Sequence, residues 1–155
     1  LPNAVTPITV PTKTQEPTLK PLDTDRRSPR PEDEWYLRGR SLQAAGDHVS
    51  AILQFTLSID NLPEFIPAYE ARSDSYWEIG DPDSALRDIT RSIELEPTGD
   101  KYHQRGQRYQ SLKKHLAAID DYTRAIELFP GNPIYFASRD KAHSDLKEVE
   151  DAIRD

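Results

Sequence analysis

From Glu32 onward the sequence repeats itself at intervals of 33 or 34 residues. The phrase RSIELEPTGDKY, which begins at Arg91, returns as RAIELFPGNPIY at Arg124. Alanines that precede an aliphatic residue, prolines and aromatic residues all recur at this period. The recurring residues are Ala51, Ala85, Ala118 and Ala152, then Pro63, Pro97 and Pro130, and finally Trp35, Tyr69, Tyr102 and Phe136. Because several residue classes share one period, the sequence predicts stacked copies of a single structural unit.

Each unit is predicted to contain two helices joined by a short turn. In the third unit, small and aromatic residues recur at the spacing of one helix face, once before the turn and once after it. The first face holds Tyr102, Gly106 and Tyr109, and the second holds Ala118, Tyr122 and Ala125. In the second unit, Gly80 and Asp81 interrupt the two faces, and Asp81 followed by Pro82 is typical of a helix start.

This pattern resembles the tetratricopeptide repeat, a unit of 34 residues with the motif W-x2-L-G-x2-Y, then A-x3-F, then P. On that frame the units are residues 32–65, 66–98 and 99–132, and a partial fourth unit, 133–155, stops partway through its second helix. The resemblance implies an all-α fold, a right-handed solenoid of antiparallel helix hairpins. Glycine or serine at unit position 8 and alanine at position 20 should lie where the helices cross, because small side chains let backbones approach. The fourth unit departs from the motif, with Asp140 at the glycine position and His143 at an aromatic position.

The first 31 residues differ from the rest in composition. They hold seven of the 13 prolines, no aromatic residue and a net charge of +2. Such a segment buries too little apolar surface to offset the entropy of ordering it, so we expect a flexible, disordered N-terminal tail or linker before a domain at residues 32–155. The chain begins at Leu1 and contains no methionine. A trimmed N-terminus with such a tail is compatible with an exported or membrane-tethered protein, and the compartment stays open.

Composition and motif spacing argue against several functions. A formal charge of -7 argues against a nucleic-acid-binding module, which needs a basic surface. The chain has no cysteine, and its four histidines have no ligand-like spacing, so no metal site or cofactor is predicted. No nucleophile has a base nearby, and no glycine-rich phosphate loop is present. We therefore expect a protein that is not an enzyme.

An arginine recurs at unit position 7, where the family usually has leucine: Arg38, Arg72, Arg105 and Arg139. An aspartate follows 16 residues later in three units, at Asp88, Asp121 and Asp155. One interpretation is a row of arginines for an anionic ligand. The other is a structural ion pair in each unit that holds the helices in register. Because the carboxylates match the arginines, we favour structural pairs, Arg72 with Asp88 and Arg105 with Asp121.

In the family that this sequence resembles, ligands lie along the concave surface formed by the first helix of each unit. Carried over by position, this implies a set of partner-binding candidates. They are Tyr36, Arg40, Glu70, Asp74, Trp77, Glu78, His103, Gln107 and Lys141. Three acidic residues at the centre, Glu70, Asp74 and Glu78, favour a basic or apolar-basic partner segment. Trp77 is either an anchor for the partner or a packing residue beneath the next unit.

One branch of the family clamps the C-terminal carboxylate of chaperone tails with basic and amide residues at five positions. These positions hold Tyr36, Arg40, Ala71, Asp100 and Gln104, of which Arg40 alone is basic, so that activity is not expected. The favoured function is a protein–protein interaction scaffold or assembly factor that binds a protein or peptide in its groove. The alternative is a structural slice of a longer repeat array, or a self-associating subunit, without a groove ligand.

The C-terminal end is predicted to mediate self-association. The fourth unit ends in DAIRD, which we expect to form a short second helix. Repeat arrays need a polar cap over the last apolar face. Val149, Ala152 and Ile153 would lack such a cover, so weak self-association through this end is expected.

Overall fold

The computed structural model describes the backbone of residues 31–154 and the side chains from Glu34 to Arg154. The predicted N-terminal tail lies outside the described residues, apart from Pro31, which begins the first helix. Within the described part, the fold is all-helical, as predicted. The helices are α1 (Pro31–Ala44), α2 (His48–Asn61), α3 (Ile66–Glu78), α4 (Pro82–Leu95), α5 (Gly99–Ser111), α6 (His115–Leu128) and α7 (Pro133–Arg154).

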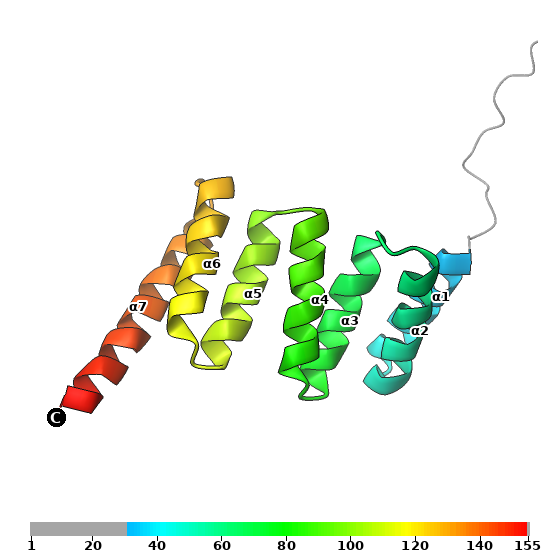
Figure 1. Ribbon diagram of the computed structural model, residues 1–155, viewed down its shortest axis with the longest axis horizontal. Coiled ribbons are helices and arrows are strands. Elements are labelled where there is room, and N and C mark those ends of the chain that lie inside the picture. The colour runs from blue at the N-terminus through cyan, green and yellow to red at the C-terminus, as the bar shows by residue number, and fades with distance from the viewer. Residues whose placement is uncertain (1–30, 155) are drawn as a thin grey trace, which may run out of the picture.

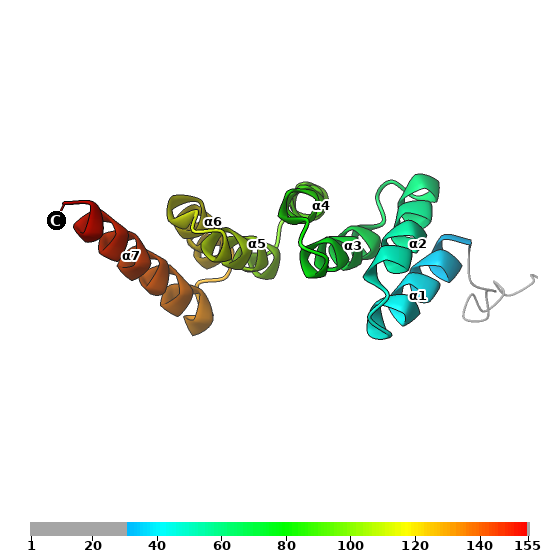
Figure 2. The ribbon, with the colours of Figure 1, turned by 90° about the horizontal axis from the view of Figure 1, so that it is seen from below.

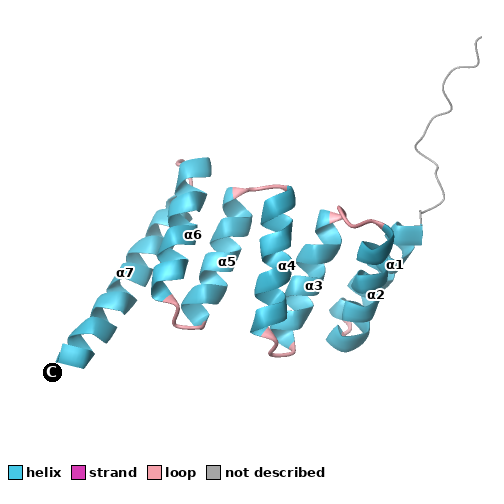
Figure 3. Ribbon diagram, viewed as in Figure 1, coloured by secondary structure: helices cyan, strands magenta, loops and turns pink. Residues whose placement is uncertain are grey.

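Antiparallel helix pairs follow one another along the long axis of the molecule (Figures 1 and 3). Seen from below, α2, α4 and α6 lie along one side of the array, and α1, α3 and α5 lie along the other (Figure 2). The core is correspondingly divided into small clusters within and between pairs. One cluster, for example, joins Ala51 and Phe55 of α2 to Ala71 of α3. This arrangement is the expected solenoid of hairpins, in which each pair buries apolar surface against its neighbours.

The turns inside the hairpins follow from local sequence. Gly46 and Gly80 adopt φ values of 81° and 78°, a region that is open to glycine and disfavoured for other residues. The following aspartates cap the next helix, because Asp47 accepts a hydrogen bond from the Ser50 amide and Asp81 accepts one from the Ser84 amide. In the third hairpin Lys113 occupies the same turn position with φ 60°, although it carries a side chain.

Small residues lie at the helix crossings, as the sequence predicts. Ala51, Ala85 and Ala118 are fully buried. A Cβ atom on Gly39 would lie 2.5 Å from Phe55, and one on Gly106 would lie 2.7 Å from Tyr122, so neither site admits a larger residue without movement. The second unit differs in a matched way, since it has Ser73 in place of glycine and Ile89 in place of the aromatic residue.

The prediction of a second helix in the fourth unit is wrong, because α7 runs unbroken from Pro133 to Arg154. The position that turns the chain in the first three units falls on Lys147, which is followed by Glu148, and both residues favour continued helix. The C-terminal end of α7 therefore projects past α6 (Figure 1). None of the described helices is long and apolar enough to cross a membrane.

Candidate functional site

The partner-binding candidates that were selected from the sequence are not all accessible to a partner at the start of the groove. The Tyr36 ring packs 5.9 Å from the Phe55 ring and 5.2 Å from the Phe65 ring, measured between centroids. It therefore joins the core clusters between the first and second units. Arg40 and Glu78 are exposed on the same set of helices. Tyr36 thus has a packing role, while Arg40 and Glu78 remain accessible.

The acidic centre of the groove is engaged by basic residues of the following unit. Glu70 accepts a hydrogen bond from the Ser92 hydroxyl at 2.9 Å and lies 3.3 Å from the Lys101 ammonium. Asp74 accepts hydrogen bonds from the Gln104 amide and from the Arg108 guanidinium. Burial raises the pKa of Asp74, and the Arg108 guanidinium opposes that shift. Two of the three carboxylates on which the preference for a basic partner rested are therefore already paired.

Trp77 also contacts the following unit. The Arg108 guanidinium lies over the indole ring, 5.6 Å from its centroid. Arg108 is itself only 6% exposed, so this cation is held between the units and is not offered to solvent. This face of the Trp77 ring therefore packs against the following unit, in line with the packing alternative.

His103 connects α5 to α7. Its ring lies between the rings of Tyr122 and Tyr135, with centroid distances of 5.4 and 5.1 Å, and its Nε2 atom is 2.9 Å from the Ser138 hydroxyl oxygen. Burial lowers the pKa of His103, and the nearby Asp100 carboxylate opposes that shift. The geometry gives His103 a role in fastening α7 to the array.

A cleft of about 460 Å³ opens between α5 and α7. It contains two of the selected residues, Gln107 and Lys141, and its other lining residues are Gln110, Ser111, Lys113, Tyr122, Ser138 and Asp145. A hydrogen-bonded chain joins four of its lining residues. The Tyr122 hydroxyl donates to Gln110, the Gln110 amide donates to Asp145, and the Lys141 ammonium donates to the other oxygen of Asp145 at 3.3 Å.

Two members of this hydrogen-bonded chain have shifted pKa values. Burial raises the pKa of Tyr122 to about 12, so the phenol keeps its proton and remains a donor at neutral pH. The hydrogen bond from Gln110 holds the pKa of Asp145 below its ordinary value, so the carboxylate stays charged. We name the eight residues that line this cleft the α5/α7 cleft.

A second cleft, of about 630 Å³, opens between the N-terminal ends of α3 and α5. It contains one selected residue, Glu70. Its other lining residues are Ile66, Pro67, Glu96, Thr98, Asp100, Lys101 and Gln104. We name this set the α3/α5 cleft. The Lys101 ammonium lies 2.7 Å from Glu96 and 3.3 Å from Glu70, so one buried cation serves two carboxylates.

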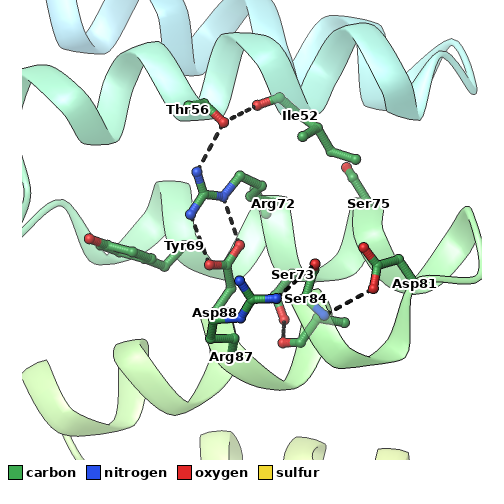
Figure 4. Close-up of polar contacts among 12 residues, drawn as sticks. Ile52, Thr56, Tyr69, Arg72, Ser73, Ser75, Asp81, Ser84, Arg87 and Asp88 are labelled. Atoms are coloured by element: carbon green, nitrogen blue, oxygen red, sulfur yellow. Dashed lines mark hydrogen bonds and ion pairs between the residues drawn. The ribbon is translucent and has the colours of Figure 1, made fainter.

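The two central arginines of the series, Arg72 and Arg105, link neighbouring units, and Figure 4 shows the contacts of Arg72. Arg72 binds Asp88 through two parallel hydrogen bonds of 2.7 and 2.8 Å, and it donates a third, of 2.9 Å, to the Thr56 hydroxyl of the preceding unit. Arg105 repeats the arrangement with Asp121 and Thr90. A guanidinium that spans a threonine and an aspartate in this way links α2 to α4, and α4 to α6.

The terminal arginines differ from the central pair. In the first unit Gln54 replaces the aspartate and Arg38 is exposed. In the fourth unit the Arg139 guanidinium lies 5.7 Å from the centroid of the Phe136 ring. Because Arg72 and Arg105 are each paired with an aspartate, the central arginines do not form a row that is open to an anionic ligand.

The tetratricopeptide-repeat family model matches residues 66–98 and 102–132, which are the second and third helix pairs. These two helix pairs are tetratricopeptide repeats. The match covers the two pairs that carry the complete arginine contacts. No curated protein matches the chain in sequence.

Solved tetratricopeptide-repeat structures share the fold. The first such domain of Spaghetti (RPAP3), bound to the HSP90 peptide SRMEEVD, superposes with a TM-score of 0.68 at 22% identity, over 77% of this chain and 96% of that one. The first such domain of human RPAP3 gives 0.69 at 23% identity, over 80% and 98%. The MamA protein gives 0.69 at 21% identity, over 79% and 68%.

Selection by repeat position missed several residues of the two clefts. Among them, Lys113 and Ser138 line the α5/α7 cleft, and Lys101 binds the carboxylates of the α3/α5 cleft. A signal for Lys113 was present in the sequence, because it stands where the first two units have glycine. No group of histidine and acidic residues that could hold a metal ion occurs within the described part of the chain.

Proposed function

We propose that this tetratricopeptide-repeat chain is a non-catalytic interaction module that holds a segment of a partner protein in its groove. The observation that carries the proposal is the pair of clefts between successive first helices, one between α3 and α5 and one between α5 and α7. Structural relatives support a protein partner, since the first domain of Spaghetti is bound to one chaperone peptide and the second domain of human RPAP3 is in complex with another, SGPTIEEVD. The matched family describes a repeat and not a catalytic domain.

The site residues proposed for contact are the accessible ones: Arg40, Glu78, Gln107 and Lys141. A partner that is basic throughout has less support than the sequence suggested, because Glu70 and Asp74 are paired with Lys101 and Arg108. Glu78 remains as an exposed carboxylate near the centre of the groove. The groove as a whole is short, so we expect affinity on the order of micromolar.

Self-association is the second candidate. The exposed fractions of Val149 and Ile153 on α7 are 44% and 81%, which leaves apolar surface at the end of the array. An array of this kind without a groove ligand would serve as a structural subunit.

Two tryptophan substitutions in a pull-down from cell extract test the groove. Gln107→Trp would fill the α5/α7 cleft, and Arg124→Trp would place the same bulk on α6, where the arginine side chain is 66% exposed. We expect the groove variant to lose the partner that the parent protein and the α6 variant retain. Equal capture by all three proteins would exclude the groove as the binding surface.

A further inference from the structure

The two clefts of the groove carry opposite charge. The α3/α5 cleft has three carboxylates, from Glu70, Glu96 and Asp100, and one ammonium, from Lys101. The α5/α7 cleft has two ammonium groups, from Lys113 and Lys141, and one carboxylate, from Asp145. Both clefts border α5, so a segment that follows this helix passes from an acidic site to a basic site.

The excess charge in the acidic cleft is accessible. Lys101 is shared by two carboxylates, and its side chain is 10% exposed. Glu96 remains 61% exposed, although its carboxylate is 2.7 Å from Lys101. Three carboxylates with one buried cation leave a net negative site at the surface. A basic side chain would find charge complementarity there.

The basic cleft has an accessible cation of its own. The Lys141 side chain is 71% exposed, and the carboxylate beside it, Asp145, already accepts a hydrogen bond from Gln110. Lys113 is exposed, and in the part of the chain that the structure describes no ion pair holds it. Lys113 also adopts φ 60°, at the turn position that glycine occupies in the first two units, Gly46 and Gly80. A lysine at this position is unfavourable for the backbone, and it places an ammonium at the rim of the cleft.

The basic cleft continues into a neighbouring hollow at the C-terminal half of α7. Lys113, Lys141 and Asp145 line both, and the continuation adds His115, Glu148, Val149 and Ala152. His115 is 7% exposed, and its buried Nδ1 atom has no hydrogen-bond partner among the described residues. His48, at the equivalent position of the first unit, has the same unpartnered Nδ1 atom, so this feature belongs to the repeat and the case for a carboxylate rests on the two lysines.

We propose that the groove binds a dipolar segment, with a basic side chain in the α3/α5 cleft and a carboxylate in the α5/α7 cleft. This inference rests on the proposed groove function and adds the chemistry and direction of the partner. Asp100 and Gln110, which line the two clefts, are ten residues apart on α5. That separation is about 15 Å along the helix axis, at the rise of an α-helix. An extended segment covers the distance with about four or five residues.

The carboxylate site lies away from the clamp positions of chaperone-binding relatives, which here hold Tyr36, Arg40, Ala71, Asp100 and Gln104. The lysines that receive the carboxylate are instead in the α5–α6 turn and on α7. The carboxylate has two possible sources, an acidic side chain or the free end of the partner chain. Both present the same group to Lys113 and Lys141.

Selection from a random peptide library with free carboxyl ends tests the inference on the full chain. We expect enriched peptides to carry a basic residue four or five positions from an acidic residue or from the carboxyl end. Synthetic peptides with and without a terminal amide then separate the two sources of the carboxylate. Enriched peptides without a consistent order of charge would overturn the inference and leave the groove function standing. If no peptide is enriched, the inference fails, and the pull-down with Gln107→Trp decides independently whether the groove function also fails.

Charge reversal on α7 supplies the matched control. Lys141→Glu should weaken binding of a selected peptide about fivefold to tenfold, as expected for an accessible ion pair that is lost and replaced by repulsion. It should also restore binding to a peptide in which lysine replaces the acidic residue. Lys147→Glu makes the same charge change at an exposed site on α7 outside the cleft and should leave the affinity unchanged. Equal effects of the two variants would show a general effect of net charge and would overturn the assignment.

Discussion

The guanidinium of Arg108, on α5, lies over the indole ring of Trp77, on α3, at 5.6 Å from the ring centroid. The same side chain donates hydrogen bonds to Ser73 and Asp74 of the second unit. One buried cation of the third unit therefore contacts an aromatic ring, a hydroxyl and a carboxylate of the second. Contacts of this kind join neighbouring units in a solenoid, where each unit depends on the next.

A double-mutant cycle at this contact measures how much it stabilises the array. Trp77→Leu and Arg108→Met should each destabilise the protein, and their coupling energy should be about 1 kcal/mol, the usual size of a partly desolvated cation–π contact. Urea denaturation of the four proteins provides the measurement. Additive effects of the two substitutions would mean that the ring and the cation do not stabilise each other.

The Arg72–Asp88 pair should be sensitive to loss of one partner. The side chains are 15% and 8% exposed, so Asp88→Ala leaves a largely buried guanidinium without its carboxylate. We expect a loss of about 3 kcal/mol in the free energy of unfolding. Glu94→Ala removes the carboxylate of an exposed pair on the same helix and should have almost no effect. Similar losses in the two variants, measured by denaturation, would contradict a structural role for the buried pair.

The size of the residue at the helix crossing should depend on its partner residue. Because a Cβ atom on Gly106 would lie 2.7 Å from Tyr122, Gly106→Ser should destabilise the protein by about 1–3 kcal/mol through overpacking. The second unit combines serine with isoleucine at these positions, Ser73 with Ile89. We therefore expect Gly106→Ser to be less harmful in a Tyr122→Ile background. Thermal unfolding of the single and double variants tests this, and purely additive losses would show that the two sites are independent.

Acid should weaken the attachment of α7 through His103. Burial holds the pKa of His103 below its ordinary value in the folded state, so the unfolded chain takes up the proton first as the pH falls. The stability that depends on the neutral ring is present above the unfolded pKa, about 6.5, and is lost as the pH falls through the lower, folded pKa. Between pH 7 and pH 5 the parent protein should lose more stability than His103→Gln. Parallel pH profiles for the two proteins would be inconsistent with this assignment.

Self-association should involve the projecting end of α7. Ile153 is 81% exposed there, and Ile153→Glu should abolish concentration-dependent association in sedimentation experiments. The outer face of α2 is the internal comparison. It carries Leu53, 61% exposed, where the corresponding residues of the next two units are Arg87 and Asp120. If Leu53→Arg abolishes association and Ile153→Glu does not, the copies meet through α2 and the C-terminal prediction is wrong.

The repeat period, the helix pairs and the small residues at the crossings could be predicted from the sequence because they depend on contacts within one unit. Gly39, Ala51 and Phe55 belong to a single hairpin, and their spacing is set by two helices and one turn. The same holds for Arg72 and Asp88, which are 16 residues apart in one hairpin. Local geometry relates such residues directly, so their order along the chain is sufficient.

The candidate site depended on contacts between units, which the sequence order does not specify. Glu70 and Asp74 appear on a solvent-facing side of α3, but Lys101 and Arg108 approach them from α5 because of how the two hairpins stack. Tyr36 likewise occupies a groove position, but its ring packs against the ring of Phe65 and becomes part of the core. The stacking angle between hairpins is set by many side chains together, so it becomes visible only in the tertiary structure.

The end of the array shows the same division between sequence and structure. The sequence determined that α7 begins after Pro130 and Asn132, where the repeat period places a new helix. Whether the chain then turns back was decided by packing. Lys113 turns the chain in a disfavoured backbone conformation because α6 follows and buries Ala118 and Tyr122. Beyond Lys147 the apolar residues Val149 and Ile153 stay exposed in the structure, so no buried contact there offsets the loss of helical hydrogen bonds, and α7 continues to Arg154.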